Sequence, residues 1–192
     1  MRPPELKSLY EVMEINGVKV FVHWSVLLIG AVVCIGAISE PATAIPSEPA
    51  TAIPGLICYY GVILLHECGH MFFAHRKHCT VWSIELYPIW GITRFNPPYS
   101  HYDYCVIAWG GVIAQLVVAV PIMILSEFIG TTRFQALNTV LAMFGFFSLF
   151  VAAFNLIPAP PLDGSIAWGL VPALFKRFLE ARNTKRESDW RL

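Results

Sequence analysis

Four long apolar stretches organise the chain, at about residues 18–39, 55–74, 104–126 and 134–157. The last two contain no Asp, Glu, Lys or Arg. A helix rises about 1.5 Å per residue, so about 20 such residues cross the hydrocarbon core of a bilayer. The pattern predicts an all-α polytopic membrane protein with about four transmembrane helices.

The first apolar stretch also has features of a cleaved signal peptide, because the small residues Ala37 and Ser39 stand where a signal peptidase would cut. The apolar run exceeds the usual length of a signal-peptide core, which favours a retained anchor. Cleavage would remove one span without reversing the direction of the others.

The segments between the spans have their own compositions. Cys79–Asp103 is rich in aromatic residues and proline and contains the strand-like run Val81–Tyr87, so we expect a short β-like or re-entrant interfacial segment there. Glu40–Pro54 is a perfect duplication with four prolines, which predicts an extended connector. A tandem duplication in a tolerant loop explains it better than a partner-binding loop does.

Positive residues indicate the orientation of the spans, since lysine and arginine collect on the cytoplasmic side of membranes. Arg76 and Lys77 follow the second span, six more basic residues lie in the C-terminal tail, and the two opposite loops share one arginine. We therefore expect both termini in the cytoplasm. The chain then divides into a cytoplasmic N-terminal arm (1–17), a membrane core (18–164), and an interfacial helix with a charged cytoplasmic tail (165–192).

The composition excludes two classes of protein. Charged residues make up 14% of the chain, against about 25% in soluble domains, so a soluble enzyme is nearly excluded. Thirteen basic residues balance thirteen acidic ones, which argues against a general affinity for nucleic acid. The expected surroundings are a lipid bilayer.

The second span contains His66-Glu67-Cys68-Gly69-His70, with the spacing H-E-x-x-H. Two histidines four residues apart lie on one face of a helix and can bind one zinc ion, with the glutamate beside them as a general base. A glutamate inside an apolar helix costs about 2.5 kcal/mol or more to insert, so it needs a partner. Polar groups bonded between helices are the alternative; the motif favours one bound Zn²⁺.

Catalytic zinc usually has three protein ligands and a water, so a third ligand must come from elsewhere in the chain. Asp163 follows Pro158, Pro160 and Pro161 at the end of the fourth span, and an unwound segment can turn a carboxylate inward. The second and fourth spans run in the same direction, so His70 and Asp163 reach the same side of the membrane. The alternative is that Asp163 caps the helix that follows.

Together, H-E-x-x-H in one span and Asn155-Leu-Ile-Pro158 followed by Leu162-Asp163-Gly164 at the end of a later one resemble the site-2 protease family of intramembrane zinc metallopeptidases. His23-Trp24-Ser25 and Leu86–Ile92 are similar to two further stretches of that family. The pair of motifs carries most of the resemblance.

One more stretch resembles the family but departs from its pattern. Ala108–Gln115 is similar to the sequence A-G-P-x-x-N, with Gly111 in place of the proline and Gln115 in place of the asparagine. The role of this stretch is therefore left open by the sequence.

The resemblance implies a peptidase of the cell (inner) membrane that cuts single-span membrane protein substrates near the cytoplasmic face, in regulated intramembrane proteolysis. A protease that first trims the substrate outside the membrane is an implied partner. Carried over to this chain, His66, His70 and Asp163 hold zinc and Glu67 is the general base. Asn155 is implied to hydrogen-bond the substrate carbonyl or the developing oxyanion.

Two alternatives compete with a protease. A divalent-metal transporter or sensor would need a polar path across the membrane, whereas the outer halves of the second and fourth spans offer only Tyr59, Tyr60, Asn138 and Thr139. An inactive relative would only hold substrates, and the intact Glu67 favours chemistry instead. The sequence leaves the substrate and the oligomeric state open.

Overall fold

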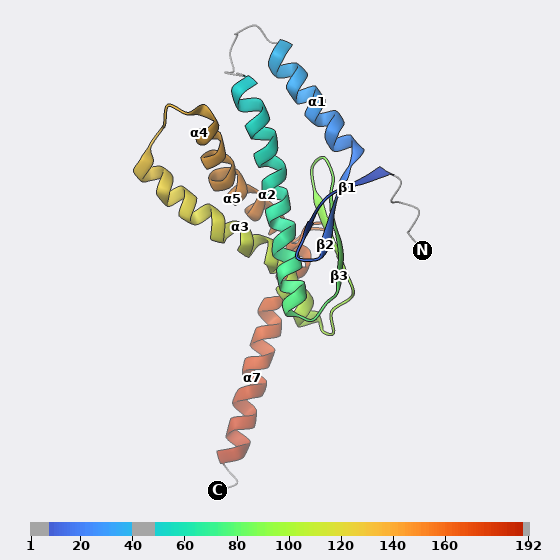
Figure 1. Ribbon diagram of the computed structural model, residues 1–192. Coiled ribbons are helices and arrows are strands. Elements are labelled where there is room, and N and C mark those ends of the chain that lie inside the picture. Colours follow the sequence, from blue (N-terminus) through green and yellow to red (C-terminus); the bar gives the residue numbers. More distant parts are fainter. Residues whose placement is uncertain (1–7, 40–48, 190–192) are drawn as a thin grey trace.

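The computed structural model describes residues 8–39 and 49–189. The elements are β1 (Leu9–Ile15), β2 (Val18–His23), α1 (Trp24–Ser39), α2 (Pro49–Arg76), β3 (Val81–Leu86), β4 (Gly91–Phe95), α3 (His101–Ile129), α4 (Gln135–Ala142), the π-helical turn η2 (Met143–Phe147), α5 (Ser148–Asn155), α6 (Gly164–Ala167) and α7 (Leu170–Asp189). Figure 1 shows α2 at the centre, with the sheet on one side and the hairpin of α3 and α4 on the other.

Within the described residues, three helical segments are long and apolar enough to cross a membrane: Ala52–Arg76, His101–Ile129 and Gln135–Asn155. They coincide with the second, third and fourth predicted spans. The predicted total of four transmembrane helices is not confirmed. Helix α1 has 16 residues, about 24 Å at the rise of an α-helix, which is less than the thickness of a bilayer core.

The prediction of a span over 18–39 was wrong at its start, because Val18–His23 is a strand. Valine alternates with other residues here, and Val18 and Val20 face the core with 3% and 1% of their surfaces exposed. This two-residue period is typical of a strand. Asn16 and Gly17 both have positive φ (50° and 80°) and join β1 to β2, as an Asn-Gly hairpin turn does.

The predicted β-like segment between the second and third spans is a β-hairpin within a larger sheet. The sheet has the order β1-β2-β3-β4, so the N-terminal hairpin pairs with the later one. Strands β2 and β3 are parallel, and the other two pairs are antiparallel. A parallel pair needs a long crossover, which α1 and α2 provide. The sheet packs on α2 through Ile84, fully buried, and Met71, 3% exposed.

The predicted connector Glu40–Pro54 is only partly described. Residues 40–48 lie outside the described residues, but Pro49–Pro54 form the start of α2, so the expectation that the prolines exclude a helix was wrong there. The first N–H groups of a helix have no partner within it, and Pro49 at the first position therefore removes no hydrogen bond.

Helices α2 and α3 approach each other closely at two glycines. A Cβ atom on Gly69 would lie 2.3 Å from the carbonyl oxygen of Gly110, and a Cβ on Gly110 would lie 2.7 Å from that of Gly69. Any larger residue would push the helices apart. This contact holds the H-E-x-x-H segment against α3.

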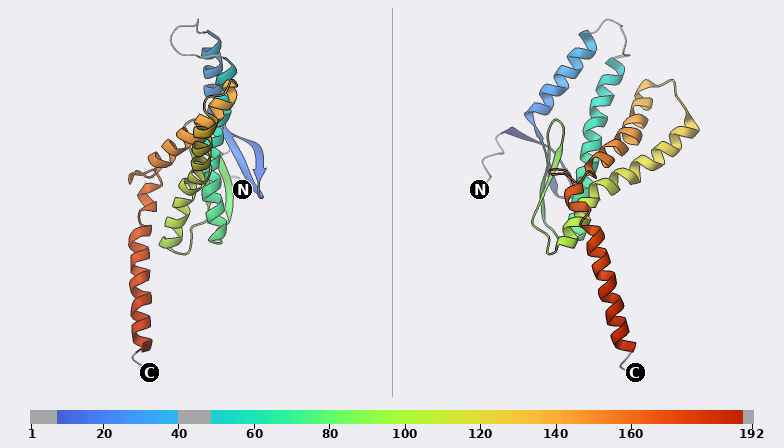
Figure 2. Two further views of the ribbon diagram at one scale, coloured as in Figure 1. Left: turned by 90° about the vertical axis from the view of Figure 1, so that its left-hand side faces the viewer. Right: turned by 180° about the vertical axis from the view of Figure 1, so that it is seen from behind.

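The C-terminal part (165–192) was predicted to be an interfacial helix, for which the apolar stretch 166–175 is suited, followed by a charged tail. The structure divides that stretch between α6 and α7, and α7 continues through the charged residues to Asp189. Figure 2 shows α7 projecting away from the other helices in both views. Near its start, the Arg177 guanidinium lies 3.8 Å from the centre of the Tyr102 ring of α3.

Candidate metal and catalytic site

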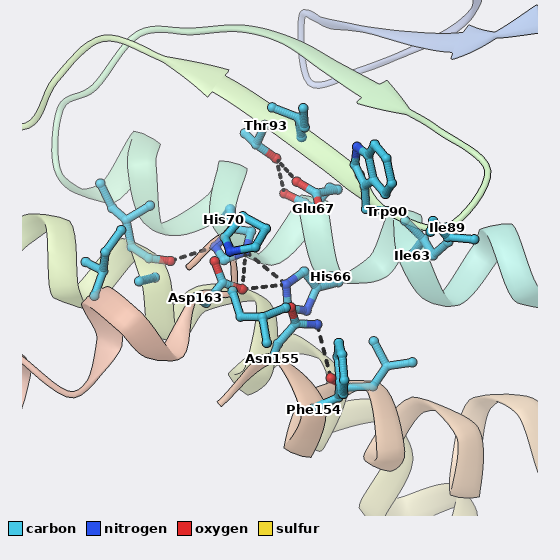
Figure 3. Close-up of a pocket in the computed structure, with 18 of the residues that line it drawn as sticks. Ile63, His66, Glu67, His70, Ile89, Trp90, Thr93, Phe154, Asn155 and Asp163 are labelled. Carbon is cyan, nitrogen blue, oxygen red and sulfur yellow. Dashed lines mark hydrogen bonds and ion pairs between the residues drawn. The ribbon is translucent and has the colours of Figure 1, made fainter. Parts of the chain in front are cut away.

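Helix α2 presents His66, Glu67 and His70 to the interior of the protein. All three are buried, with 6%, 5% and 7% of their surfaces exposed. The Nε2 atoms of the two histidines lie 3.0 Å apart, as expected for residues on one helical face. Figure 3 shows both imidazoles turned toward Asp163, which arrives from the opposite side.

The segment after α5 carries Asp163 to these histidines. Its Oδ2 atom lies 2.8 Å from Nε2 of His66 and 3.2 Å from Nε2 of His70. The side chain of Asp163 makes no capping bond to α6, so the capping alternative does not describe this structure. The chain turns back tightly here, because a Cβ on Gly164 would lie 2.3 Å from the carbonyl oxygen of Leu156.

The contacts around Asp163 change the pKa of its carboxyl group. Burial by itself would raise the pKa of the carboxyl group, but its hydrogen bonds with His66 and His70 outweigh that effect. The pKa of Asp163 therefore lies below the usual range for an aspartate.

The three groups are arranged as a metal-binding site. The distances among the three donor atoms are 2.8, 3.0 and 3.2 Å. Ligands of a tetrahedral zinc ion with bonds of about 2.0–2.1 Å lie about 3.3 Å from one another, so a slight outward movement accommodates the ion. Two imidazole nitrogens and one carboxylate oxygen are a donor set that zinc accepts.

The other nitrogen of each imidazole is held by α3. Nδ1 of His70 donates to the carbonyl oxygen of Ile107 at 2.8 Å, and Nδ1 of His66 lies 2.9 Å from Oε1 of Gln115. A carbonyl oxygen can only accept, so Nδ1 of His70 carries a proton, and Nε2 is the nitrogen that faces Asp163 and would bind a metal. Such outer partners orient the ligands of a metal.

The two residues that depart from the family pattern both contact His66. Gln115 is fully buried and holds the ring through its amide oxygen. A Cβ on Gly111 would lie 2.5–2.7 Å from three atoms of the same ring. Gly111 therefore leaves the space that His66 occupies, and Gln115 sets its orientation.

Glu67 lies under strand β4. The Thr93 hydroxyl donates to Oε2 of Glu67 at 2.7 Å, and Figure 3 shows Thr93 directly above that carboxylate. The sequence pattern did not indicate Thr93, because a lone threonine in a strand has no local signature. The similarity of Leu86–Ile92 to the family ends one residue before it.

A cavity of about 910 Å³ adjoins these groups. It is bordered by α2, β4, α3, α5 and the proline-rich segment, and His66, Glu67, His70 and Asp163 line it. Asn155 lines the same cavity, while its Nδ2 donates to the carbonyl oxygen of Val151 at 3.0 Å. All five sequence-predicted site residues therefore share one cavity, and the roles assigned to them stay predictions.

Two comparisons with known proteins found similarities to this chain. The model of peptidase family M50 matches residues 114–187, a range that includes Asn155 and Asp163 but not the histidines of α2. The fold is similar to that of the solved "Site-2 Protease from Methanocaldococcus jannaschii", with a TM-score of 0.60 and 22% identity, covering 88% of this chain and 72% of the other. A search of curated proteins found no match.

Proposed function

We propose that this chain, which resembles the site-2 protease family and matches the model of peptidase family M50 over residues 114–187, is an intramembrane zinc metalloendopeptidase. The convergence of His66, His70 and Asp163 beside Glu67 is the observation that carries the proposal. These groups lie among helices that are long and apolar enough to cross a membrane.

The chemistry follows from the position of each group. Zinc held by His66, His70 and Asp163 would supply a Lewis acid that polarises a peptide carbonyl and lowers the pKa of a water molecule, so that the water can lose a proton and attack near pH 7. Glu67, next to His66, takes the proton from the attacking water and returns it to the leaving amine. Asn155 faces the same cavity and would hydrogen-bond the substrate carbonyl or the oxyanion.

The substrate segment would bind as a strand. A helical substrate hides its carbonyl groups in hydrogen bonds, so the segment to be cut must first unwind. The strand-like region around Ile84–Ile92 is the candidate for this pairing. Strand β3 already has partners on both sides, whereas β4 pairs only with β3 among the described elements. We therefore propose the edge of β4, where Gly91 and Ile92 line the cavity, as the place of pairing.

Crosslinking tests this pairing. We expect Ile92→Cys, combined with Glu67→Gln so that substrate is not consumed, to form a disulfide with a cysteine placed in the substrate segment. Val12→Cys on β1, at the opposite edge of the sheet and 61% exposed, is the matched control. Equal yields from positions 92 and 12 would remove β4 as the pairing edge.

The proposed setting is that of regulated intramembrane proteolysis. The substrates would be single-span membrane proteins, cut near the cytoplasmic face after another protease has trimmed them outside. Both termini would lie in the cytoplasm and the protein in the cell (inner) membrane. The support comes from the family resemblance and from the basic residues that follow α2 and extend through the tail.

Metal removal tests the proposed function. We expect the purified chain to cut at least one of a panel of tagged single-span substrates, to lose more than about 95% of that activity with a strong chelator, and to recover it with one equivalent of Zn²⁺, because the chemistry depends on a Lewis acid. The measurement is the rate of appearance of the shortened fragment. Cleavage that persists after the zinc has been removed would contradict a metallopeptidase.

A further inference from the structure

Strand β4 lies directly on the carboxylate of Glu67. Thr93 pairs with Ile84 of β3, and its hydroxyl reaches Oε2 of Glu67 at 2.7 Å and the backbone oxygen of Glu67 at 3.0 Å. In the described part of the chain, no other hydrogen bond to that carboxylate is found. A single hydroxyl therefore sets the direction of the carboxylate.

Gly91 contributes to the same contact from two residues away. A Cβ atom at this position would lie 2.5 Å from Cγ and 2.6 Å from Oε1 of Glu67. The strand can come this close only because Gly91 has no side chain. Oε2 is thus bonded to Thr93, and Oε1 lies against the backbone of Gly91.

The position of β4 is itself held by an ion pair. Arg94 donates through Nε to Oε1 of Glu85 at 2.5 Å and through Nη2 to Oε2 at 2.9 Å. This two-bond geometry fixes β4 against β3. The hydrogen bond with Glu85 also raises the pKa of the Arg94 guanidinium. The Thr93 hydroxyl therefore occupies a defined place above α2.

We propose that Thr93 is a positioning residue that connects the general base Glu67 to the strand on which the substrate pairs. The inference rests on the proposed function. The Thr93 bond occupies one carboxylate oxygen and leaves the other to receive a proton. Because the same strand binds substrate at its edge and holds Glu67 from its face, the base is aligned relative to the bound peptide and not to α2 alone.

Thr93→Val tests the role of the hydroxyl, because valine has nearly the same shape and cannot donate. We expect kcat to fall about tenfold or more, since a general base contributes about 10² to 10⁴ and a small misplacement loses part of it. KM should stay within about twofold. Thr93→Ser, which keeps the hydroxyl, should recover kcat to within about threefold of the wild type.

Three further measurements separate positioning from a structural defect. Thr93→Val should bind as much zinc as the wild type, and Thr93→Val with Glu67→Gln should crosslink substrate through Ile92→Cys as well as Glu67→Gln does alone. In a double-mutant cycle, adding Thr93→Val to Glu67→Gln should lower kcat no further. Additive losses, or equal deficits in the serine and valine variants, would overturn the proposal.

Gly91→Ala provides an independent test that does not depend on how Thr93→Val folds. The added methyl group would occupy the place of the Glu67 carboxylate, so kcat should fall at least as far as in Thr93→Val while zinc is retained. Gly55→Ala in the same helix as Glu67 is the matched control, since its Cβ would meet only Thr139 Cγ2 at 3.8 Å. Full activity in both Gly91→Ala and Thr93→Val, with Glu67→Gln inactive, would refute the inference and leave the proposed function standing.

Discussion

The Glu67→Gln variant is expected to lose peptide cleavage by more than about 100-fold while it keeps its fold and its zinc. Glutamine has the shape of glutamate and can still accept a hydrogen bond from Thr93, but it cannot take a proton from water. General bases contribute about 10² to 10⁴ to enzymatic rates, and here the same group also returns the proton to the leaving amine. The measurement is the initial rate of fragment formation, with zinc content determined on the same sample.

Glu127→Gln is the matched control, because Glu127 is exposed near the end of α3 and outside the cavity. It should cleave like the wild type. The Glu67→Gln result also separates the alternatives, since metal transport or substrate holding would survive the exchange. Unchanged cleavage by a zinc-loaded, folded Glu67→Gln variant would eliminate Glu67 as the base.

The Asp163→Ala variant is expected to bind zinc more than about 100-fold more weakly and to lose cleavage with it. Loss of an outer partner of a metal ligand costs about 10- to 100-fold in affinity, and loss of a ligand removes a coordinate bond and a negative charge as well. The two remaining histidines are both on α2 and are a weak site by themselves. The measurement is a competition titration against a chelator of known zinc affinity.

Asp103→Asn is the control for the removal of one carboxylate. Asp103 lies near the start of α3, where it is 2.8 Å from Nζ of Lys77 and bonded to Ser100. It belongs neither to the donor set nor to the cavity lining. Its exchange should leave zinc affinity unchanged. Equal zinc affinity in Asp163→Ala and the wild type would mean that the third ligand is another group.

The sequence predicted most of what depends on local periodicity. Long runs without charged residues indicate the helices that could cross a membrane, because burying an unpaired charge in lipid is costly. The interval between His66 and His70 places them on one helical face. Strand β2 was missed because its valines also continue the apolar run of the helix that follows, although Asn16-Gly17 before it is a hairpin signal.

Only the tertiary structure decided which groups far apart in the chain meet. The direction of the spans placed Asp163 and His70 on the same side of the membrane and favoured a ligand over a helix cap, but the contact between them depends on how the proline-rich segment packs against α2. Gln115 and Thr93 come from two other elements, and their contacts with His66 and Glu67 depend on helix and strand packing. Local sequence thus determined the helical histidine pair, whereas the surrounding donors were determined by long-range packing, which has no local periodic signal.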